Sequence, residues 1–165
     1  MPDLLRWLGL GALVVVLDQW SKSVVSSHFA YGESMAITPF FNMVLAHNQG
    51  AAFSMLNYAG GWQRWLFSAI AVVAAAWIAV LLHKHRQQKL FCFALALILG
   101  GALGNLIDRI AYGYVVDFLD FHWKTSHFPA FNLADSAITC GAVLLLWDGF
   151  MNKSPSHMGS KAEKN

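Results

Sequence analysis

Four long apolar runs constrain the fold of this chain more than any other feature. They cover about residues 4–25, 62–82, 90–107 and 131–150. A helix needs roughly 20 mostly apolar residues to cross the hydrocarbon core of a bilayer. Only 12% of the residues are charged, about half the fraction that is typical of a soluble domain. The alternative is a very apolar soluble bundle, but the length of the runs favours an α-helical membrane protein with four transmembrane helices.

The distribution of Lys and Arg predicts how the spans are oriented. Basic residues precede the first run at Arg6, separate the second run from the third within 83–89, and follow the fourth run within 153–164. Residues 26–63 contain no Lys or Arg, and residues 111–130 contain only Lys124. Cytoplasmic loops carry the excess of basic residues. We therefore expect both termini in the cytoplasm and two larger outer loops.

The expected organisation is one domain over residues 1–152. Its outer loops cover about residues 26–61 and 108–130, and a disordered cytoplasmic tail follows at 153–165. In the first loop, "FFNMVLA" and "AAFSM" are apolar and favour short strands. In the second loop, "VVDFLDF" is compatible with a strand or with a short interfacial helix, and we expect it to be extended and then helical.

Cysteine, histidine and net charge exclude several classes of function. Cys92 and Cys140 fall inside expected spans, where they are interpreted as small apolar residues and not as a disulfide. His122 and His127 have no Cys or acidic partner at zinc-like spacing, so no metal or other cofactor is expected. The net charge of +2 and the lack of a basic aromatic patch give no reason to expect a nucleic acid partner.

Ionisable side chains within the spans are candidate functional residues, because each costs about 2.5–3.5 kcal/mol at the centre of a bilayer. Asp18 and Lys22 lie four residues apart, so they share a helix face and are interpreted as a structural ion pair. Asp108 and Arg109 end the third run and are interpreted as boundary charges, with Arg109 in a supporting role. The glycines of "GGALGN" favour close helix packing.

Asp135 is harder to explain as a structural residue. No Lys or Arg lies three or four residues away from it. On a helix it shares one face with Asn132, Ser136 and Thr139, which predicts a polar stripe facing the interior of the bundle. Such a stripe indicates a transport pathway or an active site.

Asp117 supplies a second carboxyl group just before the fourth span. The 17 residues between Asp117 and Asp135 are enough to fold back. Two carboxyls that share a site cannot both ionise easily, so the pair holds one proton. One carboxylate can then take a proton from an attacking water, while the other donates to a peptide carbonyl oxygen. This is the chemistry of an aspartic protease.

Five blocks of sequence, taken in order, resemble the lipoprotein signal peptidase family (signal peptidase II), which are membrane aspartic peptidases. The blocks are "DQWSK" at 18–22, "NQGAAFS" at 48–54, "GGALGNLIDR" at 100–109, "VVDF" at 115–118 and "FNLADSAI" at 131–138. The resemblance covers about residues 5–150. It implies a small extracytoplasmic β-cradle formed by the first outer loop and a short helix in the second loop that acts as a lid.

The resemblance also implies which residues form the site. Asp117 and Asp135 would be the catalytic pair. The residues that bind substrate or support the site would be Asp18, Lys22, Asn48, Gly50, Asn105, Arg109 and Asn132. Asp120 is the competing candidate for the second acid, but it is expected on the wet side of the loop together with His122.

The substrate that the resemblance implies is a diacylglyceryl-modified prolipoprotein, cut on the N-terminal side of the lipidated lipobox cysteine. It further implies the bacterial cytoplasmic (inner) membrane, contact with membrane lipid and inhibition by the cyclic peptide globomycin. Two other functions remain open from the residues alone. One is an ion-coupled transporter with Asp18, Asp108 and Asp135 as relay groups. The other is an assembly factor that binds membrane helices through "GGALG".

Overall fold

Four long helices make up most of the computed structural model, which describes residues 2–50 and 61–151. The helices are α1 (Pro2–His28), α2 (Trp62–Lys84), α3 (Lys89–Ala111) and α4 (Leu133–Met151). Each is long and apolar enough to cross a membrane, so the four expected spans are confirmed. The expected strand "AAFSM" and the expected tail at 153–165 lie outside the described residues.

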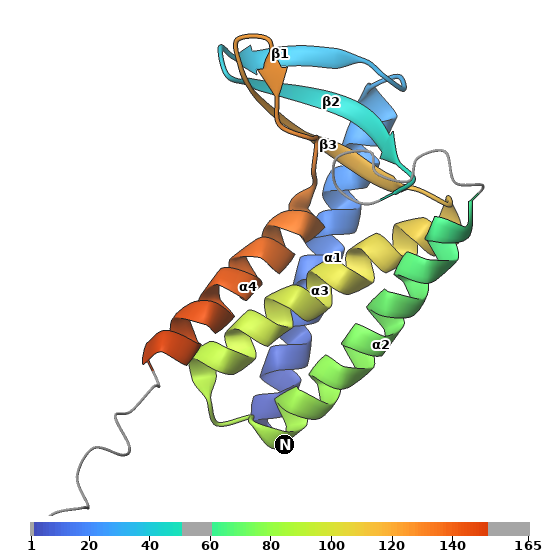
Figure 1. Ribbon diagram of the computed structural model, residues 1–165. Coiled ribbons are helices and arrows are strands. Elements are labelled where there is room, and N and C mark those ends of the chain that lie inside the picture. Colours follow the sequence, from blue (N-terminus) through green and yellow to red (C-terminus); the bar gives the residue numbers. More distant parts are fainter. Residues whose placement is uncertain (1, 51–60, 152–165) are drawn as a thin grey trace, which may run out of the picture.

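Helix α3 is the centre of the bundle and packs against the other three helices (Figure 1). Over its apolar window 56% of α3 is buried, against 28% or less for each of the others. Glycines allow this close approach. A Cβ atom on Gly100 would lie 2.6 Å from the Gly11 carbonyl oxygen of α1, and one on Gly101 would meet the Ala134 carbonyl oxygen of α4. The close packing expected of "GGALGN" is therefore confirmed.

The outer surface of the bundle is apolar. Large side chains of α1, α2 and α4 point away from the core, among them Trp20 (65% exposed), Trp77 (67%) and Trp147 (59%). A continuous apolar surface of this kind is unfavourable in water and favourable in lipid. The bundle surface thus agrees with a membrane environment.

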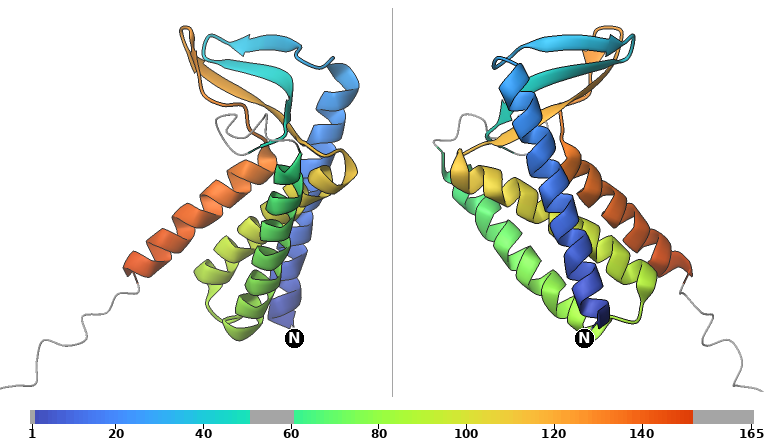
Figure 2. Two further views of the ribbon diagram at one scale, coloured as in Figure 1. Left: turned by 45° about the vertical axis from the view of Figure 1, so that its right-hand side comes forward. Right: turned by 180° about the vertical axis from the view of Figure 1, so that it is seen from behind.

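A small antiparallel sheet covers the end of the bundle opposite the N-terminus (Figure 2). Its strands, in spatial order, are β1 (Ser34–Thr38), β2 (Phe41–Asn48), β3 (Val115–Trp123) and β4 (Ser126–His127). The strand expected at "FFNMVLA" is confirmed by β2. The extended start of "VVDFLDF" is confirmed by β3.

The short helix expected in the second outer loop is wrong. Between Ala111 and Leu133 the chain forms β3, β4 and turns, with no helix in this described stretch. The physical reason is that β3 pairs with β2 on one edge and with β4 and Phe131 on the other. Those partners come from other segments of the chain, and they satisfy backbone groups that a helix would otherwise satisfy internally.

A second apolar cluster attaches the sheet to the bundle. It combines Val25 of α1, Leu45 of β2, and Val116 and Phe118 of β3. In addition, the Val116 N–H donates to Asp108 Oδ2 at the end of α3, at 3.1 Å. These contacts fix β3 over the C-terminal ends of α1 and α3, and thereby fix the position of Asp117 there.

Candidate active site

Asp117 is a buried carboxyl group near the start of β3. Its side chain is held by two amides: Asn48 Nδ2 donates to Oδ2 at 3.0 Å, and Asn132 Nδ2 donates to Oδ1 at 2.8 Å. Asn48 is itself oriented by Gly50, whose N–H donates to Asn48 Oδ1 at 3.0 Å. Because the Asn48 oxygen is occupied in this way, its NH2 group points at Asp117. Asn48 and Gly50 therefore act together on the same carboxylate.

Asp135 belongs to the N-terminal cap of α4. The Asp135 N–H donates to Asn132 Oδ1 at 2.9 Å, and the Asn132 N–H donates back to Asp135 Oδ2 at 3.3 Å. This reciprocal pair is a capping box with Asn at the N-cap and Asp three residues later. The helix start thus fixes the orientation of the carboxyl group. Asp135 Oδ1 faces α3, where Asn105 Nδ2 donates to it at 2.7 Å.

Asn132 connects the two aspartates. It is fully buried, its side-chain amide binds Asp117 and its backbone N–H binds Asp135. The same amide also donates to Asn105 Oδ1 at 3.1 Å and to the Val116 carbonyl at 3.2 Å. Two carboxyl groups from separate segments therefore lie on either side of one asparagine.

Lys22 lies next to Asn105 and is only 3% exposed. Its Nζ donates to Asn105 Oδ1 at 3.0 Å and forms ion pairs with Asp18 Oδ2 at 2.7 Å and Asp108 Oδ2 at 2.9 Å. The expected Asp18–Lys22 pair is present, with Asp108 as an additional partner. Because Asn105 accepts from Lys22, its amide NH2 is directed at Asp135.

Asp18 also stabilises the start of α4. Its Oδ1 accepts the Ala134 N–H at 2.9 Å, one of the N–H groups that a helix start leaves unpaired. Gly104 of α3 makes room for this carboxylate, since a Cβ there would lie 2.5 Å from Asp18 Oδ2. A negative charge is favourable at this helix end. Asp18 thus ties the helix that carries Asp135 to α1.

Arg109 lies at the edge of the network. Its guanidinium donates to the Asn105 carbonyl at 3.4 Å and sits 5.3 Å from the centre of the Phe67 ring. Its charge interacts through space with Asp135, Asp117 and Asp108. The contact with α2 through Phe67 agrees with a supporting position.

Sequence reasoning misses part of this site. Asp108, interpreted as a boundary charge, is 1% exposed and pairs with Lys22. Gln19 is not singled out at all, yet its Nε2 donates to Asp108 Oδ1 at 2.8 Å and to Asp18 Oδ2 at 3.3 Å. The sequence feature that could have identified Gln19 as part of the site is its position next to Asp18 within an apolar run.

Two sequence-based expectations about side-chain positions are wrong. Thr139 is exposed, so the polar stripe of α4 ends at Ser136. Beyond that point α4 still packs on α3, but through Ile138 and Gly141, and Thr139 lies on another face of the helix. Asp120 is 7% exposed and does not lie on the wet side of the loop. It is covered because Asn42 of β2 and His127 of β4 both bind its carboxylate.

The pKa of Asp117 is raised from its ordinary 3.8 to about 7. Burial is the largest cause and the nearby Asp135 carboxylate the next, while the hydrogen bonds from Asn48 and Asn132 and the charge of Lys22 act in the opposite direction. Near neutral pH the pair therefore readily holds one proton. One carboxyl can donate a proton while the other accepts one. Within residues 2–50 and 61–151, no group of three or more His, Cys, Asp or Glu side chains is arranged to hold a metal ion.

Comparisons with known proteins agree on one family. The model of the family described as "Signal peptidase (SPase) II" matches residues 10–151. A protein named lipoprotein signal peptidase from Paraburkholderia phytofirmans is 62% identical over 146 residues, which is 88% of this chain and 85% of the relative. One of the same name from Ralstonia nicotianae is 63% identical over 142 residues, 86% of this chain and 82% of the relative.

A solved structure is also similar over nearly the whole chain. It is titled "Bacterial membrane enzyme structure by the in meso method at 2.3 A resolution". It superposes with a TM-score of 0.79 at 30% sequence identity, and the match covers 93% of this chain and 94% of the solved one. The bundle and sheet described above are therefore shared with a solved bacterial membrane enzyme.

Proposed function

The chain belongs to the signal peptidase II family, and on that premise we propose that it is an aspartic endopeptidase acting on diacylglyceryl-modified prolipoproteins. It removes the signal peptide by cutting on the N-terminal side of the lipidated cysteine. The observation that carries the proposal is the contact of Asn132 with both Asp117 and Asp135. This contact supports a pair of carboxyls that share one proton at one end of a membrane bundle.

In the first step, the ionised member of the Asp117–Asp135 pair accepts a proton from water as the water oxygen attacks the scissile carbonyl carbon. The protonated member donates its proton to the carbonyl oxygen, which becomes a hydroxyl of the tetrahedral intermediate. The proton belongs to the pair jointly and not to either residue. Asn48, Asn105 and Asn132 hold the two carboxyls in place, so little reorganisation is needed during the reaction.

In the second step, the carbon–nitrogen bond of the intermediate breaks. The leaving amine of the lipidated cysteine takes the proton that the first carboxylate received from water, and the intermediate hydroxyl returns its proton to the other carboxylate. The pair thus ends with one proton, as it began. The new carboxyl terminus belongs to the released signal peptide.

The proposed topology places both termini in the cytoplasm and the site near the outer face. The support is that the two aspartates lie at the sheet end of the bundle, whereas the α2–α3 turn with its basic residues lies at the N-terminal end (Figure 1). The apolar signal peptide would approach laterally through lipid. The transporter alternative is weaker, because Asp18 and Asp108 are both paired with the buried Lys22 and are not free relay groups.

A direct assay tests this function. The purified protein in detergent is incubated with a prolipoprotein that carries diacylglycerol on its lipobox cysteine and, separately, with the unmodified precursor. We expect mass spectrometry to show a cut immediately before the cysteine in the modified substrate only. Globomycin should block the reaction. Absence of cleavage, or equal cleavage of both precursors, would contradict the proposal.

The raised pKa of Asp117 predicts how stability depends on pH. Since its pKa rises from 3.8 to about 7 on folding, the folded protein holds a proton that the unfolded chain has released. The contribution of this group to the free energy of unfolding is therefore fully present below pH 4. It is lost as the pH rises through 7, which lowers the free energy of unfolding by about 4 kcal/mol.

The Asp117→Asn variant lacks this titration. Its melting temperature should exceed that of the wild type by a margin that grows between pH 4 and pH 8. The measurement is thermal unfolding of both proteins in one detergent over that pH range. A margin that is constant with pH would argue against the raised pKa.

A further inference from the structure

A side-chain contact outside the catalytic pair closes the hairpin that joins the two aspartates. From Asp117 the chain continues along β3, turns at Lys124, which has a left-handed backbone with φ 55°, and returns through β4 towards Asn132. Asp120 of β3 and His127 of β4 meet across this hairpin: His127 Nδ1 lies 3.0 Å and 2.9 Å from the two oxygens of Asp120. Among the described residues, neither forms a hydrogen bond or ion pair with Asp117 or Asp135.

The backbone pairing of this hairpin is interrupted beside Asp120. Near the turn, the Phe128 N–H donates to the Phe121 carbonyl at 2.7 Å, and near the site Phe131 and Leu119 exchange hydrogen bonds at 2.8 and 3.1 Å. The two residues between Phe128 and Phe131, one of them a proline, make no pairing with β3 in the described structure. The Asp120–His127 contact lies beside this gap and supplies a cross-link there.

Asp120 is anchored on the other side as well. Asn42 Nδ2 of β2 donates to Asp120 Oδ2 at 2.9 Å, so the carboxylate ties β2, β3 and β4 together while being only 7% exposed. Strand β2 also carries Asn48, which binds Asp117. Strands β2 and β3, which position Asp117, therefore also hold β4, the start of the segment that leads to Asp135, through Asp120.

We propose that Asp120 and His127 form a positioning clamp, which holds segment 126–132 against β3 and so sets how closely Asp135 approaches Asp117. The inference rests on the proposed function, because it concerns the geometry of the same carboxyl pair. Both are positioning residues, since they act through Phe131 and Asn132 and not on the substrate. The clamp fixes the position of β4 and of the segment that follows it. Because the capping box of α4 joins Asp135 to the end of that segment, the position of Asp135 follows from it.

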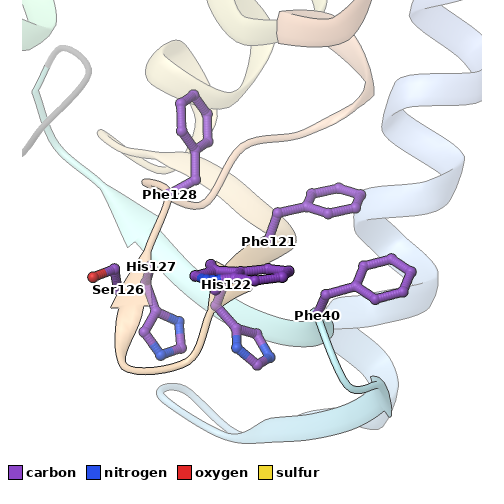
Figure 3. A pocket seen from close by; sticks show the side chains of 7 residues that line it. Phe40, Phe121, His122, Ser126, His127 and Phe128 are labelled. Atoms are coloured by element: carbon purple, nitrogen blue, oxygen red, sulfur yellow. The ribbon is translucent and has the colours of Figure 1, made fainter.

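The competing explanation for His127 is ring packing. Its ring stacks on His122 with centroids 5.0 Å apart, and both rings line an open aromatic pocket at the sheet end, together with Phe40, Phe121, Trp123, Ser126 and Phe128 (Figure 3). Two substitutions separate the explanations. His127→Phe keeps the ring but has no donor, whereas His127→Asn keeps a donor in the position of Nδ1 but has no ring.

The experiment compares these two variants with wild type and with His122→Phe, a matched control that removes a neighbouring imidazole without touching Asp120. We expect His127→Phe to lower kcat about tenfold, because a small misplacement of reacting groups is costly, with KM within about twofold. Amide hydrogen exchange of 126–132 should also speed up in that variant. His127→Asn and His122→Phe should behave like wild type in both measurements.

Two results would overturn the clamp. One is unchanged kcat and exchange in His127→Phe. The other is a loss in His127→Asn at least as large as that in His127→Phe, because ring packing predicts that the variant without a ring suffers most, or an equal loss in His122→Phe, which leaves the Asp120 contact intact. If the wild type does not cleave the lipidated precursor, the proposed function fails, whereas the exchange rates still decide whether the clamp holds segment 126–132.

Discussion

Replacing Asp117 or Asp135 by asparagine should reduce cleavage of the lipidated precursor by about 10³-fold or more. Each carboxyl has a role that an amide cannot take: an amide neither accepts a proton from the attacking water nor donates an acidic proton to the carbonyl oxygen. The two substitutions should be far from additive, because a pair that shares one proton fails as a unit. The measurement is single-turnover cleavage in detergent, followed by mass spectrometry.

The substituted proteins should remain folded, which separates a chemical defect from a structural one. At pH 8 Asp117→Asn should melt at a higher temperature than wild type, because it removes a buried negative charge next to Asp135. The matched control is Asp148→Asn, which makes the same chemical change at the other end of α4. It should retain full activity. Cleavage that persists in either dyad variant would remove that residue from the pair.

The part of the fold that depends on single segments is predictable from the sequence. Run length alone identifies the four helices, because crossing a bilayer requires a fixed number of apolar residues. Asp135 stands out for the related reason that a carboxyl in lipid needs a compensating role. The spacing of Asp18 and Lys22 likewise predicts their ion pair, since residues four apart share a helix face.

The features that were missed depend on partners from distant segments. The role of Asp108 requires that α1 and α3 cross where Lys22 reaches it, and spacing along α3 contains no information about that crossing. Asp120 is buried only because Asn42 and His127 come from other strands. For β3, the choice between strand and helix is made by its neighbours β2 and β4 and not by its own residues.

Lys22→Met should destabilise the protein strongly. The substitution keeps most of the side-chain volume but removes the ammonium that lies between two carboxylates, at 2.7 Å from Asp18 and 2.9 Å from Asp108. Removing one partner of a buried ion pair typically costs about 3–5 kcal/mol, because the remaining charge stays buried without compensation. For a chain of this size the expected fall in melting temperature is on the order of 10 °C.

Two further variants make the origin of this loss measurable. Arg6→Met removes the cation of an exposed pair with Asp3 at 3.5 Å and should leave the melting temperature unchanged, because exposed pairs contribute little. The double variant Lys22→Met with Asp108→Asn removes one of the stranded carboxylates, and it should recover part of the lost stability.

Activity in the Lys22 series should follow a different course from stability. Lys22 also holds Asn105, whose amide orients Asp135, and Asp108→Asn does not restore that contact. The double variant should therefore regain melting temperature without regaining cleavage. If Lys22→Met and Arg6→Met lower the melting temperature equally, the buried network is not what stabilises the C-terminal ends of α1 and α3. If the double variant recovers cleavage together with stability, Lys22 serves the fold and not the orientation of Asp135.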